Sequence, residues 1–549
     1  MKVLLLDYLS SLREREELDA IFPDLLAEHG FEVFSRPGRG GAQRGVDVGA
    51  TRVEESGRVV YLFTIKPGDL NRADWSGSTQ AVRQSLEEIL EAYIPNRLPD
   101  EYRSDPIVVC VVIGGAMNET VRELFTGFCR KHRSARIEFS EWNGERLAGM
   151  LMSGIHGETV IVKGLRSPLQ KSIAMVDFPD VSERHFKVLA ELVSEAAGDD
   201  VGLVRASLQI SVCAWMIYVW CRQSGNMESA IRASEISLAT LWSLTCKAES
   251  SPVKAKMREA FARCVEMHIQ VFDTYFGDRI RPAMGSEDWV ARAVGSRSPV
   301  DASLIGHRLI GRCAIAGLWR LWLQDEGRSV AGLRDAATYL KDAMDIWEQN
   351  LALSLPIADF QSSSVGSVML LSARCKNEGL RLTAMLEAMI SRLGFALATR
   401  TRYPVVFSSY SDLAMHPRSK DDRYFERAGG ASTLVPLVAM FCIARGLGAQ
   451  LDMLFETLAK QWPNVSLQVW MVDKSSDAGL LQGRDDHGKA VLLERRSGLA
   501  DIQRQIAAAL STDKDYSRLS MISGSVSPLL PLCCTRIGLP LPAQLIVDI

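Results

Sequence analysis

The amino-acid sequence predicts a multidomain protein: an N-terminal α/β domain, a mainly α-helical region and a small C-terminal α+β portion. Its 549 residues exceed what one hydrophobic core usually accommodates, which is roughly 250–300 residues. Apolar strand-like runs alternate with helical patterns in the first part of the chain. Helical spacing then dominates until strand-like runs return after residue 400. We therefore expect domains over residues 1–160, 180–398 and 399–549.

The N-terminal domain should contain a central sheet, because its strands and helices alternate along the chain. A helical spacing of leucines ends at Gly30, and a continuous β-branched run at residues 107–113 is typical of a buried parallel strand. Asn118 is placed to cap the helix that follows this strand. The expected helices are 9–29, 79–93, 119–132 and 144–151, and the expected strands are 31–34, 46–50, 59–66, 107–113 and 136–139.

The middle of the chain is amphipathic at helical spacing almost throughout, as in stacked helical hairpins. No shared signature recurs at a period of 33 to 47 residues, so a solenoid stays an open alternative. The expected helices are 182–197, 203–222, 228–247, 253–276, 302–325, 330–353 and 366–394. Beyond residue 400 we expect a helix over 434–460 and strands over 467–473 and 490–494.

Composition and charge exclude several classes of protein. The chain is 47% hydrophobic with a net charge of −3, so it is neither disordered nor globally basic. Its eleven cysteines contain no CxxC pair, which is typical of reduced thiols in a cytoplasm. The most apolar run, residues 210–221, is shorter than the ~20 residues that span a bilayer. The apolar start of the chain is also too short for a signal peptide. We expect a cytoplasmic protein with no membrane partner.

Two residues on neighbouring predicted strands are the candidates for a metal-binding and catalytic site. Asp47 lies in Gly45-Val46-Asp47-Val48, and Lys66 ends the run Thr64-Ile65-Lys66. In a hairpin these two side chains can share one face of the sheet. A carboxylate there can hold a divalent cation, and a lysine beside it can orient water and stabilise phosphate charge, which phosphodiester hydrolysis requires. Taken singly, each residue is better explained as a solvated charge, Asp47 at a strand end and Lys66 at a sheet edge.

These motifs resemble the PD-(D/E)XK, or restriction-endonuclease-like, superfamily and are closest to its Mrr-type subgroup. Later segments are similar to nuclease-like modules of bacterial anti-phage defence proteins. The resemblance covers residues 10–155 and implies an α/β nuclease domain that acts on DNA with Mg²⁺ or Mn²⁺. The segments that carry it are Glu17, Gly30-Phe31-Glu32-Val33, Gly45-Val46-Asp47-Val48, Leu62-Phe63-Thr64-Ile65-Lys66, residues 66–70, the helix with Gln80 and Gln84, and residues 142–147.

The resemblance implies a role for three residues and exposes one departure. Asp47 matches the metal-binding aspartate, Lys66 the catalytic lysine, and Glu17 a glutamate that lies near the metal in some members. The position two before the lysine should be acidic, but it is Thr64, whose hydroxyl is a poor ligand for Mg²⁺. Either Glu17 or Glu32 supplies the missing carboxylate, or the domain is an inactive subunit that binds nucleic acid or a partner protein.

The remaining expectations concern partners. Residues 36–45 form a glycine-rich loop whose Arg36, Arg39 and Arg44 can contact phosphates without sequence preference, although a solvated turn explains them equally well. The helical region is expected to bind a protein partner or to form a homo-oligomer. Two further patterns are set aside: residues 483–490 approximate a P-loop but lack its Ser or Thr, and Cys264 with His268 supplies only two of the four ligands of a zinc site.

Overall fold

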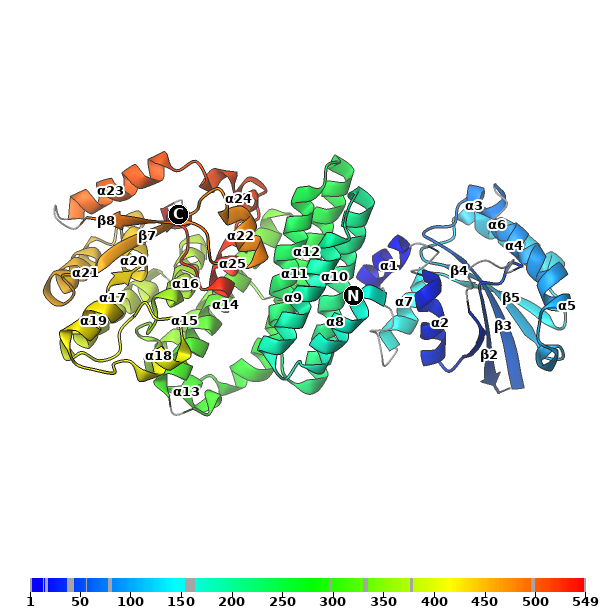
Figure 1. Cartoon of the computed structure of the whole chain (residues 1–549), viewed down its shortest axis with the longest axis horizontal. Helices are drawn as coiled ribbons and strands as arrows, with labels where there is room; N and C mark the ends of the chain where they lie inside the picture. Colours follow the sequence, from blue (N-terminus) through cyan, green and yellow to red (C-terminus); the bar gives the residue numbers. More distant parts are fainter. Residues whose placement is uncertain are drawn as a thin grey trace. The chain divides into compact units, whose positions relative to one another are not determined.

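The computed structural model describes residues 2–12, 14, 18–36, 44–55, 57–77, 81–153, 163–296, 298–328, 334–375, 379–494 and 499–547. The protein is 66% helical, with a mixed five-stranded sheet near the N-terminus and a three-stranded sheet near the C-terminus (Figure 1). It divides into two compact units. Unit 1 comprises Met1–Ser237 and Lys247–Ala260, and unit 2 comprises Leu238–Cys246 and Phe261–Ile549.

The sheet of unit 1 contains the five strands that the sequence predicts, in the order β1-β2-β3-β4-β5. The first three strands are antiparallel neighbours, whereas β3, β4 and β5 are parallel. The β-branched strand β4 lies inside the sheet between β3 and β5 and is almost wholly buried, as its continuous apolar run predicts. The strands span β1 (Glu32–Ser35), β2 (Val48–Glu54), β3 (Gly57–Lys66), β4 (Ile107–Ile113) and β5 (Ile137–Trp142).

Helices surround this sheet, and one expected helix is wrong in its extent. The helix predicted over residues 9–29 is two α-helices, α1 and α2, and Glu14 and Leu18 between them are π-helical. Asn118 caps α6 as predicted by accepting the Thr120 amide at 3.2 Å. The helices are α1 (Lys2–Ser11), α2 (Asp19–Glu28), α3 (Arg72–Ser76), α4 (Val82–Glu88) with its π-helical continuation Ile89–Tyr93, α5 (Ile94–Asn96), α6 (Glu119–His132) and α7 (Gly144–Ser153).

Both faces of the sheet are covered by apolar side chains. One face carries the core that includes Leu62 and Val109, which packs with Val82 and Leu86 of α4. The other face carries an aromatic cluster in which Phe22 of α2 meets Phe63 edge-on, with ring centroids 4.9 Å apart. Burial on both sides holds β3 rigidly, and the end of β3 is where Lys66 lies.

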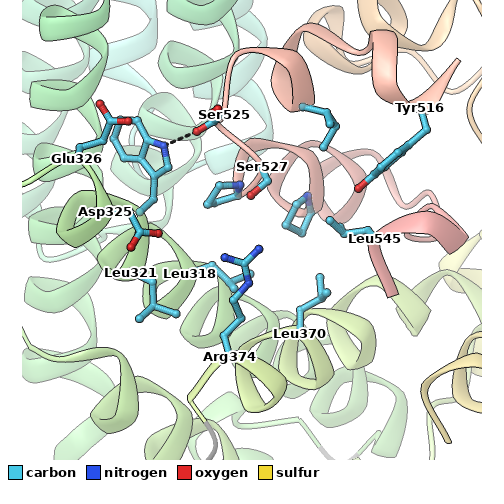
Figure 2. Close-up of a pocket in the computed structure, with 14 residues that line it drawn as sticks. Leu318, Leu321, Asp325, Glu326, Leu370, Arg374, Tyr516, Ser525, Ser527 and Leu545 are labelled. Carbon is cyan, nitrogen blue, oxygen red and sulfur yellow. Dashed lines mark hydrogen bonds between the residues drawn. The ribbon is translucent and has the colours of Figure 1, made fainter. Parts of the chain in front are cut away.

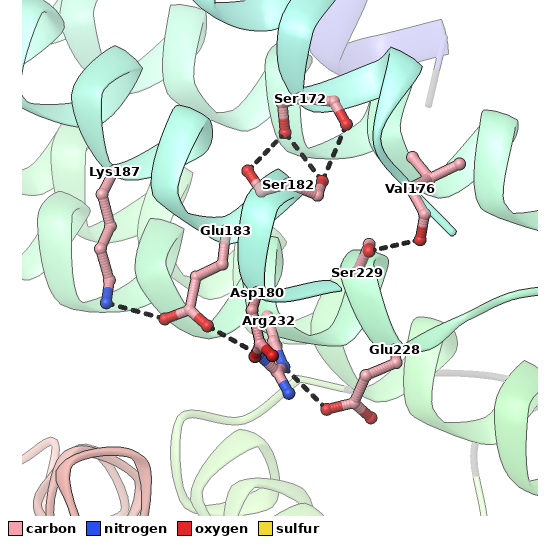
Figure 3. A network of polar contacts seen from close by, with 9 residues as sticks. All are labelled: Ser172, Val176, Asp180, Ser182, Glu183, Lys187, Glu228, Ser229 and Arg232. Atoms are coloured by element: carbon pink, nitrogen blue, oxygen red, sulfur yellow. Dashed lines mark hydrogen bonds and ion pairs between the residues drawn. The ribbon is translucent and has the colours of Figure 1, made fainter. Parts of the chain in front are cut away.

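A helical bundle completes unit 1. Its helices are α8 (Lys163–Ala174), α9 (Pro179–Glu195), α10 (Asp200–Ser224) and parts of α11 (Glu228–Lys247) and α12 (Ser251–Tyr275) (Figure 1). Figure 3 shows a polar network between them: Ser172 and Ser182 each donate to the other's carbonyl oxygen, at 2.9 and 2.8 Å. The guanidinium of Arg232 pairs with the carboxylates of Asp180, Glu183 and Glu228.

Replacing Arg232 by methionine should lower the free energy of unfolding by about 2–3 kcal/mol. The Arg232 side chain is 17% exposed, and its removal leaves the carboxylates of Glu183 and Glu228, which are 16% and 21% exposed, without this partner. Chemical denaturation of wild type and variant measures the difference. Lys460→Met, which removes an exposed ion pair of unit 2, is the control and should change little.

Unit 2 is built around the long buried helix α14, which packs against α13, α15, α16 and α25. Its small sheet has the order β6-β7-β8. The helices and strands are α13 (Trp289–Val294), α14 (Pro299–Asp325), α15 (Ala336–Glu348), the 3₁₀ turn η8 (Asp359–Gln361), α16 (Ser362–Cys375), α17 (Gly379–Thr399), α18 (Tyr410–Met415), α19 (Asp422–Ala428), β6 (Ala431–Ser432), α20 (Leu434–Ala444), α21 (Gly448–Gln461), β7 (Ser466–Met471), α22 (Ser476–Gln482), β8 (Lys489–Leu493), α23 (Leu499–Thr512), α24 (Ser520–Ser523), α25 (Leu529–Ile537) and α26 (Ala543–Val547).

Two of the helices expected here are each a pair of helices. The stretch 366–394 contains the end of α16 and most of α17, and the stretch 434–460 contains α20 and α21. The second break has a clear local cause. Gly446 takes a left-handed conformation with φ +66°, and the Leu447 amide then returns to the Cys442 carbonyl at 2.8 Å. That geometry ends a helix, and glycine adopts it without steric cost.

Helices α10 and α17 are long and apolar enough to pass for membrane spans. In α10, however, 72% of the apolar stretch is buried within the protein, as in the core helix of a globular unit. The corresponding share of α17 is 39%. The structure therefore does not describe a clear membrane protein.

Three buried histidines should make the stability of unit 2 depend on pH. Burial lowers the pKa of His268 to about 3 and the pKa values of His307 and His416 to about 4, from an ordinary 6.5. They stay neutral in the fold, while the unfolded chain takes up protons below pH 6.5. The free energy of unfolding should therefore fall from pH 6.5 towards pH 4, by about 1.4 kcal/mol per pH unit for each histidine. In denaturation of His268→Gln across this range, the free energy of unfolding should change less steeply with pH, by the contribution of one proton.

Candidate metal centre

Asp47 immediately precedes β2 and is held beside the end of β3 by backbone contacts. Its amide donates to the Phe63 carbonyl at 2.8 Å, and its Oδ2 accepts the Ile65 amide at 2.7 Å. The preceding Gly45 has φ +78° and lies so close to α4 that a Cβ atom would stand 2.1 Å from the Ser85 carbonyl oxygen. Only glycine fits there, so the approach to Asp47 is fixed by a residue that cannot be replaced without moving the backbone.

Lys66 ends β3 beside this carboxylate and pairs with a second one. Its Nζ lies 3.2 Å from Oε2 of Glu14, which belongs to the segment between α1 and α2. The Lys66 side chain is 11% exposed and that of Glu14 is 29% exposed, so the pair is largely shielded from water. The parallel pairing of Lys66 with Ile113 of β4 fixes the backbone under the lysine. Glu14, Asp47 and Lys66 thus converge at the carboxyl end of β3.

The electrostatics of Asp47 show a shortage of positive charge. Burial raises its pKa from 3.8 to about 6, against the lowering effects of the Ile65 amide, the Lys66 ammonium and the Thr64 hydroxyl; Glu14 adds to the rise. The carboxylate is charged above pH 6 in the folded protein but already above pH 4 in the unfolded chain. At neutral pH this difference costs the fold about 3 kcal/mol. One lysine does not balance two carboxylates.

The residues present fit one divalent cation with an open coordination sphere. Mg²⁺ is usually bound through one or two carboxylates, with water and substrate phosphates as its other ligands. Asp47 and Glu14 supply two carboxylates, and a cation would relieve the charge shortage at Asp47. No group of three or more His, Cys, Asp or Glu side chains with metal-binding geometry occurs among the residues that the structure describes. Two carboxylates are donors of the kind that Mg²⁺ takes, whereas a closed zinc site has four ligands.

The structure brings together only part of the predicted site. Lys66 is close enough to Asp47 for its charge to lower the pKa of that carboxyl, and Thr64, 1% exposed, lies between them in sequence with no charge to offer. Glu17 lies outside the described residues. Glu32 pairs with Thr51 of β2, four residues along the strand from Asp47, so it lies about 13 Å from the site and does not replace the missing carboxylate.

Glu14 is a candidate site residue that the sequence alone does not single out. It precedes Glu17 by three residues, so the two would share a face in a continuous helix. The run of charges at residues 13–17 offered no apolar marker for choosing between its glutamates. Glu14 is identified by its contact with Lys66 in the folded protein, which the sequence spacing does not show.

The arginines of the predicted phosphate loop have different surroundings. Arg36 pairs with Asp24 at 3.0 Å, and Asp24 also pairs with Arg166 at 3.2 Å, so part of the Arg36 charge is neutralised within the protein. Arg44 is exposed and has a left-handed backbone with φ +51°. Arg39 lies outside the described residues. Arg44 is therefore the described arginine of this loop that is most available to a ligand.

No protein-family model matches the chain, and no curated protein and no solved structure is significantly similar to it.

Proposed function

We propose that unit 1 carries a restriction-endonuclease-like domain that hydrolyses DNA phosphodiester bonds with a divalent cation, as a nuclease-like component of a bacterial anti-phage defence system. The observation that carries the proposal is the convergence of Glu14, Asp47 and Lys66 at the end of β3. In the sheet, β1, β2 and β3 are antiparallel neighbours and β3, β4 and β5 are parallel neighbours. This arrangement supports the resemblance that the motifs of residues 10–155 suggest.

Each residue has a distinct task in this proposal. Asp47 and Glu14 would hold the cation, which supplies a Lewis acid for the phosphoryl oxygens and activates water. Lys66 carries three N–H donors, of which one contacts Glu14, so others are available to a phosphate oxygen or an attacking water. Thr64 donates its hydroxyl to Asp47 and thereby orients that carboxylate. The exposed Arg44 would contact the phosphate backbone.

A second candidate function is a pseudo-nuclease that binds nucleic acid or a partner protein without cutting. Thr64 favours it, because a buried hydroxyl stands where the resembled family places a carboxylate. With one negative charge fewer, the site holds a dication more weakly. In this case DNA binding persists without cleavage and weakens when Arg44 is replaced by glutamate.

A cleavage assay separates the two candidates. Supercoiled plasmid is incubated with the full chain and Mg²⁺ or Mn²⁺, and nicking is compared between wild type and Asp47→Asn. The nuclease proposal expects nicking by wild type alone. Glu123→Gln removes an exposed carboxylate of α6 and serves as the matched control. Electrophoretic mobility shifts measured on the same samples report binding, so binding without nicking in every protein supports the pseudo-nuclease.

The helical part of the chain is proposed to bind a protein partner or a second copy of the chain, in a cytoplasm. All eleven cysteines are free thiols, and most are buried, which suits a reducing compartment. Affinity capture with the full chain and with a chain that lacks residues 1–160 would show whether the helical part alone retains the partner.

A further inference from the structure

Unit 2 contains a cavity of about 520 Å³ with a polar lining. It lies among α14, the junction of η8 with α16, the start of α18 and the end of α25. This volume falls within the range of small-molecule sites, which is roughly 300–1,000 Å³. Its lining includes the polar side chains of His307 in α14 and of Thr535 and Arg536 in α25, and the apolar side chains of Leu304 and Phe360.

Three buried polar atoms of this lining have no hydrogen-bond partner in the described part of the protein: His307 Nε2, Thr535 Oγ1 and Arg536 Nη1. His307 is 1% exposed, and its Nδ1 lies 2.8 Å from the Ser303 carbonyl oxygen, which can only accept. Nδ1 therefore carries the proton, and Nε2 presents a lone pair that accepts a hydrogen bond. Buried polar groups are nearly always paired in folded proteins, so three around one cavity are unusual.

Arg536 strengthens this observation because it carries a full charge. The side chain is half-buried, and its Nη1 has no hydrogen-bond partner in the described part of the protein. Gly483, in a left-handed turn, leaves room for the guanidinium where any side chain would collide with it. Asp485 lines the same cavity but is exposed and does not pair with Arg536. No ion pair of Arg536 is seen among the described residues, so its charge is available to an anionic ligand.

A second cavity in unit 2 provides a comparison (Figure 2). It has a similar volume of about 520 Å³ and also contains an arginine, Arg374, without an ion-pair partner among the described residues. There, however, Arg374 is exposed to water, and the exposed carboxylates of Asp325 and Glu326 lie on the same wall. Its polar atoms are solvated and of mixed sign, so this cavity selects no ligand charge.

We propose that the first cavity binds a small organic anion whose phosphate or carboxylate group pairs with Arg536. The planar guanidinium offers parallel N–H donors to either group. The Thr535 hydroxyl adds a donor to the anion, and His307 accepts a hydrogen bond from a hydroxyl or amine on the ligand body. Leu304 and Phe360 supply apolar contact for that body. This ligand site belongs to unit 2 and is independent of the metal centre proposed for unit 1.

The test uses the full chain and four ligands with a common aromatic body: phenyl phosphate, benzoate, benzyl alcohol and benzylamine. Thermal unfolding is followed at equal ionic strength. At least one of the two anions should raise the unfolding midpoint of unit 2 by about 2–4 °C, whereas the alcohol and the amine should not. The anion that acts distinguishes a phosphate ligand from a carboxylate ligand.

Variants then locate the site. Arg536→Gln should abolish the anion-dependent shift, and Thr535→Val should weaken anion binding at least threefold by titration calorimetry. Arg374→Gln, in the comparison cavity, should leave both measurements unchanged. Arg536→Gln should also keep or raise the midpoint of the ligand-free protein, because it removes an unpaired charge, whereas a purely structural arginine would lower it. Equal shifts with the alcohol and the anions, or an unchanged shift in both Arg536→Gln and Thr535→Val, would overturn the proposal.

Discussion

Lys66→Met is expected to reduce metal-dependent DNA cleavage by about a hundredfold or more. Among the residues that the structure describes, the Lys66 ammonium is the positive charge that acts on both Glu14 and Asp47, and the negative charge that develops on phosphoryl oxygens would lose it. Methionine retains most of the apolar stem, so packing at the end of β3 should survive. Single-turnover nicking of plasmid at saturating Mn²⁺ measures the effect.

A loss of folding must be distinguished from this loss of catalysis. Removing the lysine leaves the carboxylates of Glu14 and Asp47 unopposed, so Mn²⁺ should bind Lys66→Met more tightly than it binds wild type. Lys131→Met, at an exposed position of α6, is the matched control and should cleave as wild type does. If Lys66→Met cleaves at the wild-type rate, Lys66 has no catalytic role.

Thr64→Glu is expected to make the stability of unit 1 depend on a divalent cation. The new carboxylate would be buried beside Asp47, whose pKa is already raised by burial. Without a cation, like charges in this shielded place should lower the free energy of unfolding by about 3 kcal/mol or more. With Mn²⁺ or Mg²⁺, a third carboxylate should tighten binding at least tenfold and restore the lost stability.

Thr64→Val is the matched control, since it keeps the shape of threonine and removes only the hydroxyl. It should show neither the loss of stability without a cation nor the rescue by one. The variants are compared by thermal unfolding with and without about 5 mM Mn²⁺. This concentration is on the order of the dissociation constants of weak protein sites for such ions. A Thr64→Glu protein that unfolds at the same temperature with and without Mn²⁺ would show that no cation binds at Asp47.

The sheet of unit 1 was predictable because its strands have strong local patterns. The continuous β-branched run of β4 indicates a strand buried on both faces, and Asn118 marks the start of the next helix. Helix breaks were harder to predict, because local features such as the left-handed Gly446 interrupt longer periodic patterns. Periodicity predicts which face is buried better than it predicts where one helix gives way to another.

The candidate site was predictable only where its residues lie on strands. Asp47 immediately precedes β2 and Lys66 ends the neighbouring strand β3, so sheet geometry brings them close. Glu14 reaches them from a segment more than 30 residues away in the chain, and no spacing rule selects it over Glu17. The cavity of unit 2 has no sequence signature at all. His307 and Arg536 are more than 200 residues apart, and their lack of partners appears only in the folded protein.

The central claim is that Glu14 and Asp47 together hold a divalent cation beside Lys66. Titration calorimetry of the full chain with Mn²⁺ tests it most directly, with Glu14→Gln, Asp47→Asn and the exposed control Glu123→Gln. Wild type and the control should bind one ion at this site with equal affinity, and each of the other variants should bind at least tenfold more weakly. Wild type that binds no Mn²⁺, or Glu14→Gln that binds it as wild type does, would contradict the claim.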